Sequence, residues 1–418
     1  MVGGEGRQAP SCASLSHHSM TSTKGPGWAS NEEFFLPAGN EPPPPQRLDD
    51  LRTPCMIGFL DKIQRNCDRM LGRSKQMNCR LRPHVKTHKT VDAALIQTGG
   101  RRSGITCSTI AEAFFFQSAG RFDDILYAVP ITADKFLDAM LLNKIMSNFH
   151  IMVDNDEMVS KLLEFEHQSH SKPWSVWVMV DCGYHRDGLD PESTKSIELV
   201  RRLLSAPGKV KLSGIYTHGG HSYGVESNEE IIRIATAERD AVVDFVTRLK
   251  SQVEGLGEVC VGVGSTPTCS TLPEHLNGVD EMHPGNYVYY DEMQVQLGSC
   301  QPEDVAVRVL MRVIGKYPEQ NMLLVDCGWT GMSAQGSDAN YGRIVGHNLC
   351  IKVLKQEAGE VTSIDGTPIP FDKYPIGCLL QLSPYHSCAT THQHRSIHIL
   401  ENEDSTHVRH TWSICKGW

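Results

Sequence analysis

The chain has 418 residues, of which 40% are hydrophobic and 21% charged, so it is long enough for two globular domains. Its net charge of −9 argues against a nucleic-acid-binding surface, because phosphate backbones need a concentrated positive field. No apolar run of about 18 residues predicts a membrane span, and residues 1–20 lack the apolar core of a secretory signal. The 14 cysteines form no CxxC pair, which is typical of thiols in a reducing compartment, so we expect a cytoplasmic enzyme.

The N-terminal part predicts an extension followed by the first ordered elements. Residues 1–48 are rich in glycine, proline and serine without any period, so we predict a disordered extension. Residues 54–60 predict a short strand, which we expect to join the C-terminal domain. Residues 60–71 carry apolar side chains at helical spacing.

Residues 49–299 predict a (β/α)8 barrel, because eight short apolar segments alternate with helical periodicity. An open doubly wound sheet is the competing arrangement, but it does not require so regular a count of eight. The predicted helices lie within residues 108–120, 156–168, 194–206 and 229–257. The predicted strands lie within residues 80–85, 103–108, 124–130, 149–155, 174–183, 211–220, 259–266 and 282–291.

Residues 300–418 change to a pattern of strands separated by turns such as EAGE and DGTP, without helices between them. This pattern predicts a second, all-β domain. The fold class is therefore α/β, with a TIM-type barrel followed by a C-terminal β domain.

Polar side chains gather where the predicted barrel strands end, which is where the active sites of such barrels lie. The segment RPHVKTHK at residues 82–89 ends strand one, and a solvated basic turn is its alternative interpretation. Strand five runs into DCGYHR at residues 181–186. Strand six ends in Tyr216, His218, His221 and Tyr223.

Strand seven ends in GSTPT, a motif that favours phosphate binding. Gly264 allows the backbone to approach an anion, and Ser265 and Thr266 add hydroxyl donors at the start of a short helix. A lysine facing such a phosphate cup indicates a Schiff base with pyridoxal phosphate. We prefer Lys86 over Lys89, because Lys86 closes the extended run whereas Lys89 precedes the next helix.

The sequence HSC near the C-terminus predicts a metal pair. If it lies in a strand, His386 and Cys388 face the same side and can bind one ion. Histidine with thiolate selects Zn²⁺, and two protein ligands leave positions open for water and substrate. A chance pattern in a half-buried strand is the alternative. His392 and His394 form a second pair of this spacing, which we predict to lie on the surface.

Several of these segments together resemble the eukaryotic D-serine dehydratases. These enzymes belong to the fold-type III pyridoxal-phosphate family, whose barrel is similar to that of alanine racemase. The resemblance runs from about residue 49 to residue 418. It rests on RPHVKTHK, VDCGYHRDG, YTHGGHSYG, VGVGSTPT, MHPGNYVYYD and PYHSC.

The resemblance assigns roles to the candidate residues. It implies that Lys86 forms the Schiff base with pyridoxal phosphate and acts as general base. The implied cofactor-binding residues are Arg186, Tyr216, Tyr223, Gly264, Ser265 and Thr266, and the implied zinc ligands are His386 and Cys388. One departure is Tyr385, where the resemblance leads us to expect asparagine.

The implied activity is dehydration and deamination of D-serine to pyruvate and ammonia by a zinc-dependent homodimer, with D-threonine as a second candidate substrate. A D-threonine-type aldolase on the same fold is the nearest alternative, and Cys388 argues against it because a harder metal site uses a carboxylate. A racemase needs no metal at the β-hydroxyl. A non-catalytic pyridoxal-phosphate carrier needs neither the metal pair nor the β domain, and a barrel enzyme without a cofactor also stays open.

Overall fold

The computed structural model describes residues 46–102, 104–165, 172–336 and 340–418. The predicted extension of residues 1–48 therefore lies almost wholly outside the described residues. Among the described residues, no helix has the length and apolar composition needed to cross a membrane.

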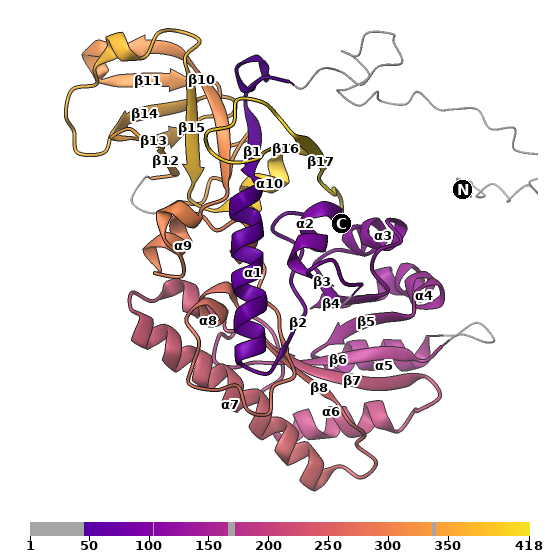
Figure 1. Cartoon of the computed structure of the whole chain (residues 1–418). Coiled ribbons are helices and arrows are strands. Elements are labelled where there is room, and N and C mark those ends of the chain that lie inside the picture. Colours follow the sequence, from indigo (N-terminus) through magenta and orange to yellow (C-terminus); the bar gives the residue numbers. More distant parts are fainter. Residues whose placement is uncertain (1–45, 103, 166–171, 337–339) are drawn as a thin grey trace, which may run out of the picture. The chain divides into compact units, whose positions relative to one another are not determined.

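The first part of the chain forms the predicted barrel of eight parallel strands (Figure 1). The strands Arg80–Leu81 and Ile105–Cys107 stand at the two ends of the pairing order. The barrel closes because His84, just after the former, forms a parallel bridge with Thr106 of the latter. In the order of their pairing the strands are β2 (Arg80–Leu81), β9 (Glu281–Met282), β8 (Cys260–Val263), β7 (Val210–Thr217), β6 (Trp174–Val180), β5 (Asn148–Val153), β4 (Asp124–Pro130) and β3 (Ile105–Cys107).

The helices of the barrel follow the predicted periodicity. Several of their N-termini are capped by side chains: Thr109 and Glu112 form a reciprocal capping box, and Ser227 caps the longest helix, whereas Phe59 and Lys135, which precede two others, provide no side-chain cap. The described helices of this part are α1 (Leu60–Gln76), α2 (Val91–Gln97), α3 (Ile110–Ser118), α4 (Phe136–Ile145), α5 (Asp156–Glu164), α6 (Thr194–Leu204), α7 (Asn228–Gln252), α8 (Thr266–Ser270) and α9 (Glu292–Gln296).

The eighth predicted strand is much shorter than its sequence indicated. Only Glu281–Met282 pair as a strand, and the chain then turns through Pro284 and Gly285 into a 3-10 helix at Asn286–Val288. The amides of Tyr289 and Tyr290 both donate to the carbonyl oxygen of Asn286. The aromatic run is buried, as a central strand would be, but its backbone is coiled at the mouth of the barrel.

The C-terminal part forms a nine-stranded sheet, as predicted for an all-β domain, in which six strands close on themselves because β10 pairs with both β11 and β15. The strands of this ring are β10 (Val307–Tyr317), β11 (Met322–Val325), β14 (Gly359–Ser363), β13 (Leu349–Leu354), β12 (Gly342–Ile344) and β15 (Leu379–Pro384).

Three strands extend the ring on the other side of β10. They are β1 (Cys55–Phe59), β16 (Ser396–Leu400) and β17 (His410–Ser413). The first strand of the chain therefore lies in the C-terminal sheet, parallel to β16 and antiparallel to β10, and α1 leads from it into the barrel (Figure 1). The sequence predicted no helix after residue 300, but the α-helix α10 (Ser387–Gln393) joins β15 to β16 and brings the HSC sequence to the mouth of the barrel.

Candidate active site

A cavity of about 580 Å³ lies at the carboxyl ends of the barrel strands, where α10 of the β domain faces them. Most of the predicted site residues line it, although they come from opposite ends of the sequence. The predicted residues in its wall are Lys86, Arg186, Tyr223, Ser265, Thr266, His386 and Cys388.

Lys86 lies in a turn just after β2 and is half-buried in the cavity wall. Burial lowers the pKa of its amine, and the nearby Arg186 lowers it further, although the Cys388 thiol opposes the shift. Lys86 lines the cavity and forms no ion pair with the other described residues.

Lys89 lines the same cavity but is engaged. Its Nζ lies 2.7 Å from the carboxylate of Glu112, which is the capping glutamate of α3, and both side chains are buried. Its backbone is left-handed, with φ +54°, one residue before the cap of α2. The predicted basic turn is therefore not solvated, and its two lysines have different environments.

The GSTPT segment forms a preorganised cup. Ser265 is the N-cap of α8 and accepts from the amide of Thr268, while the Thr268 hydroxyl accepts from the amide of Ser265. Gly264 has φ +134°, and a Cβ there would lie 2.8 Å from the sulfur of Cys269. Since no larger residue fits, glycine is required where the backbone turns into the cup.

The two tyrosines and the arginine lie differently from one another. The Tyr223 hydroxyl hydrogen-bonds to the backbone and side chain of Thr266, and it faces the cavity. Arg186 is exposed, pairs with Asp187 and lies 5.2 Å from the ring of Tyr184. Both residues reach the cavity from loops that follow barrel strands.

Tyr216 lies in the barrel interior and is not part of the cavity wall. Its ring packs edge-on against His283, with 4.9 Å between ring centroids, and His283 is the residue that reaches the cavity. Gly264 is also not part of the cavity wall, whereas the next two residues, Ser265 and Thr266, are. The interior position of Tyr216 follows from its place within β7 rather than after it.

The predicted metal pair, His386 and Cys388, is brought together by a helix and not by a strand, so the predicted strand geometry is wrong. His386 is the N-cap of α10, and Cys388 is the second residue of this helix. Their side chains nevertheless meet in a hydrogen bond, because the N-cap turn folds one residue towards the other. Burial alone lowers the pKa of His386, but the Cys388 thiolate raises it to about 9.

The sulfur of Cys388 is surrounded by donors. It lies 3.1 Å from the Thr87 hydroxyl and accepts from the Asn286 amide at 3.5 Å. Burial raises the pKa of this thiol, but His386 and Thr87 bring it below its usual value, which favours the thiolate that binds metal ions. Gln335 contacts the Nδ1 atom of His386 from the β domain.

The remaining histidines of the HSC region separate. His392 lines the cavity, whereas His394 is buried and its Nε2 contacts the carbonyl oxygen of Gly331 at 2.8 Å. The prediction of a surface position is therefore wrong for His394, because its turn after α10 directs the ring inwards. The side chain of Tyr385, the departure from the expected pattern, is not part of the cavity wall.

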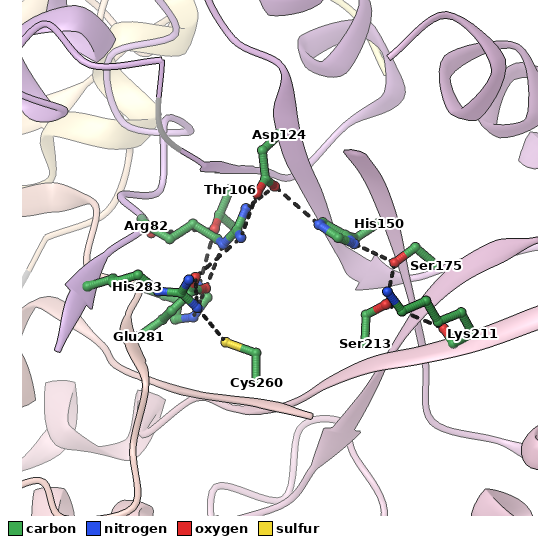
Figure 2. A network of polar contacts seen from close by, with 11 residues as sticks. Arg82, Thr106, Asp124, His150, Ser175, Lys211, Ser213, Cys260, Glu281 and His283 are labelled. Carbon is green, nitrogen blue, oxygen red and sulfur yellow. Dashed lines mark hydrogen bonds and ion pairs between the residues drawn. The ribbon is translucent and has the colours of Figure 1, made fainter. Parts of the chain in front are cut away.

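A largely buried ionic network connects several strands of the barrel (Figure 2). The guanidinium of Arg82 donates to the carboxylates of both Asp124 and Glu281, and Asp124 also contacts His150 at 3.1 Å. His283 lies between this network and the cavity, and burial lowers its pKa to about 3. The cavity wall therefore includes a neutral imidazole that contacts this polar network through Glu281 and Thr106.

Sequence reasoning did not assign several residues of the cavity wall. His84, His283 and Asn286 are buried there, and His218, noted among the polar residues after strand six, faces it as well. The histidine of the RPHVKTHK segment and the MHPGN sequence were signals for three of them. Gln335, which follows β11, carried no such signal.

The residues present fit pyridoxal phosphate. The cavity combines an amine of lowered pKa with a cup whose Gly264 allows no side chain, and its volume is in the range of small-molecule sites. The described residues contain no group of three or more metal-binding side chains, so a metal here would have His386 and Cys388 as protein ligands and open positions besides.

Comparisons with known proteins agree with this architecture. Residues 59–292 match the family model described as "Alanine racemase, N-terminal domain", and residues 306–400 match "Putative serine dehydratase domain". The chain is 35% identical to D-serine dehydratase of Dictyostelium discoideum over 85% of this chain and 95% of that protein.

The solved structures give the same result. D-threo-3-hydroxyaspartate dehydratase from Delftia sp. HT23 has a TM-score of 0.83 and 33% identity, covering 89% of this chain and 100% of that one. Alanine racemase of Clostridium difficile, with a TM-score of 0.63 and 14% identity, shares the fold. The chain therefore belongs to the alanine racemase-like, fold-type III family of pyridoxal-phosphate enzymes that includes the D-serine dehydratases.

Proposed function

We propose that the protein is a D-serine ammonia-lyase that dehydrates and deaminates D-serine to pyruvate and ammonia with pyridoxal phosphate and zinc. One observation carries the proposal: Lys86 and Cys388 line the same cavity. They lie close together, because the hydroxyl of Thr87, the residue after Lys86, is 3.1 Å from the sulfur of Cys388. The first group suits pyridoxal phosphate and the second suits a soft Lewis acid.

Lys86 and the cup would hold the cofactor at its two ends. The amine of Lys86 would hold the aldehyde end of the cofactor, and Ser265, Thr266 and Tyr223, which line the same cavity, would hold its phosphate. When bound, pyridoxal phosphate serves as an electron sink for negative charge at the substrate's α-carbon. The lowered pKa of Lys86 suits the amine to accept the α-proton of the substrate once the substrate's amino group has replaced it.

His386 and Cys388 would hold zinc on the side of the cavity that α10 forms. A zinc ion there supplies Lewis acidity for the departure of hydroxide, which is otherwise a poor leaving group. Gln335 orients the imidazole through Nδ1 and leaves the other ring nitrogen for the metal. Removal of the α-proton and the β-hydroxide yields a dehydrated amino acid that water converts to pyruvate and ammonia.

Relatives support this substrate class. The Dictyostelium protein is named a D-serine dehydratase, and the Delftia protein acts on another β-hydroxy amino acid by dehydration. One solved form of the Delftia enzyme is a cysteine-to-alanine variant in the metal-free form, which agrees with a metal role for a cysteine in that protein. By the same likeness we propose a homodimer, and the free cysteines of the described residues agree with the reducing cytoplasm.

The test is pyruvate release from D-serine by the purified protein with pyridoxal phosphate, with and without a chelator. We expect pyruvate from D-serine, little from L-serine, and loss of activity that zinc restores after chelation. A protein that shows the visible absorbance of lysine-bound cofactor but forms no pyruvate refutes the dehydratase. Release of acetaldehyde and glycine from D-threonine by that protein would then identify the aldolase, and inactivity on both would identify the carrier.

A further inference from the structure

The long helix α7 contains one buried carboxylate in an otherwise apolar face. Glu238 is 1% exposed and lies in the middle of the helix, where a charged side chain is costly to bury without partners. The other residues that α7 buries are apolar: Ile231, Ala235, Val242, Phe245, Val246 and Leu249. Such a carboxylate requires an explanation, and none of the chemistry above uses it.

The partners of Glu238 are the two loops that form the phosphate cup. Its Oε1 accepts the amide hydrogen of Gly219, after β7, at 2.5 Å and that of Gly264, after β8, at 3.0 Å. The carboxylate also hydrogen-bonds to the side chain of Thr268, which holds the N-terminus of α8. One side chain of α7 thus contacts the loops after β7 and β8 and the short helix α8 that follows the second loop.

The loop at Gly219 packs closely against the carboxyl group of Glu238. A Cβ at Gly219 would lie 3.0 Å from the Cδ atom of Glu238, so the loop passes directly over the carboxyl group. Two further contacts join the same loops nearer the cavity: Nδ1 of His218 lies 2.8 Å from the carbonyl oxygen of Gly264, and the Ser222 hydroxyl lies 2.8 Å from that of Ser265.

We propose that Glu238 is a positioning residue for the phosphate end of the cofactor site. Its carboxylate accepts the amide hydrogens of Gly219 and Gly264 on the side away from the cavity. The hydroxyl and amide groups that follow in the cup are thereby directed towards the cavity. A cup fixed before binding does not have to be ordered by the ligand, which strengthens binding. Burial raises the pKa of Glu238 to about 7, although its hydrogen bonds oppose this shift. Both amides donate to the same oxygen, Oε1, so a protonated Glu238 can still accept both hydrogen bonds through that oxygen.

The experiment compares pyridoxal phosphate with pyridoxal, which lacks the phosphate, in titrations of cofactor-free protein followed by absorbance. This inference rests on the proposed function, because it needs pyridoxal phosphate as the bound group. We expect Glu238→Leu, which lacks the acceptor, to weaken pyridoxal phosphate binding about tenfold or more and pyridoxal binding about threefold or less. Glu238→Gln, which keeps one oxygen acceptor, should restore most of the affinity.

Asp244→Asn is the matched control, since Asp244 is exposed on the same helix. If Glu238→Leu does not fold, Thr268→Val tests the same joint and should show the same preference for loss of phosphate-dependent affinity. Equal losses for both ligands, or unchanged binding in a folded variant, would overturn the positioning role. Wild-type protein that binds neither ligand would overturn the proposed function itself, and this inference with it.

Discussion

Replacing Arg82 with methionine tests the buried ionic network of the barrel. Arg82 donates to both carboxylates, of Asp124 and Glu281, and all three side chains are largely removed from water. Removing one partner of a buried ion pair costs about 3–5 kcal/mol, because the remaining charge has lost its compensation. Asp124 keeps His150, and Glu281 keeps the exposed Arg80, so we expect a loss of about 3 kcal/mol near pH 8.

The pH dependence gives this prediction a sign. Burial by itself raises the pKa of both carboxyl groups, yet in the native protein His150 and Arg82 hold that of Asp124 low, and Arg82 holds that of Glu281 low. Their contribution to stability is therefore present above the ordinary carboxyl pKa and is lost as the pH falls through the folded values. In Arg82→Met the buried carboxyl groups take up protons more easily, so the difference from wild type shrinks from pH 8 to pH 5.

The assay is urea unfolding followed by tryptophan fluorescence at pH 8 and pH 5. Trp177 is a local reporter, because the guanidinium of Arg82 lies 5.7 Å from its ring. Arg80→Met is the control: Arg80 contacts the same Glu281 but its side chain is 70% exposed, so we expect a loss below about 1 kcal/mol. An Arg82 variant no less stable than the Arg80 variant, or a deficit independent of pH, would refute the reasoning.

Three further predictions concern the cavity. Lys86→Ala should abolish both the visible absorbance of bound cofactor and pyruvate release without lowering the unfolding temperature, and surviving turnover would contradict its assignment. Gly264→Ala should destabilise the protein in urea by about 1–3 kcal/mol and weaken cofactor binding, because its φ is +134° and its methyl would lie 2.8 Å from the Cys269 sulfur; wild-type affinity would argue against the cup. His386→Ala and Cys388→Ser should keep the cofactor absorbance but lower pyruvate release by about 100-fold or more, and active variants would exclude the metal role.

The barrel and the β domain could be predicted from sequence because local patterns determine them. Eight apolar segments, each ending in polar or glycine residues, occur between amphipathic helices, and after residue 300 the helical periodicity gives way to strand patterns. The sequence reasoning missed α10, the helix that carries Cys388. Period and turn chemistry are properties of neighbouring residues, so they are readable without tertiary information. The segment at 282–291 misled this reasoning, because its buried aromatics have the composition of a strand but a coiled backbone.

The cavity was predictable only in part. Lysine after strand one and GST after strand seven follow from a rule about where barrel strands end, and both line or support the cavity. The HSC pair meets as predicted but by another geometry, since His386 caps α10 and Cys388 lies in its first turn. Sequence spacing indicates which residues can meet, whereas the cap determines how they do.

The sequence by itself determined the alternation of strands and helices, the change to an all-β domain, and the residue types that led us to propose a cofactor and metal site. Tertiary structure alone decided the long-range partners: Arg82 with Glu281, Thr87 with Cys388, and Glu238 with the amides of Gly219 and Gly264. The physical reason is that burying a charge depends on which groups the closed barrel brings within hydrogen-bonding distance. Periodicity identifies a buried face, but only the closed barrel shows which carboxylate on that face has partners.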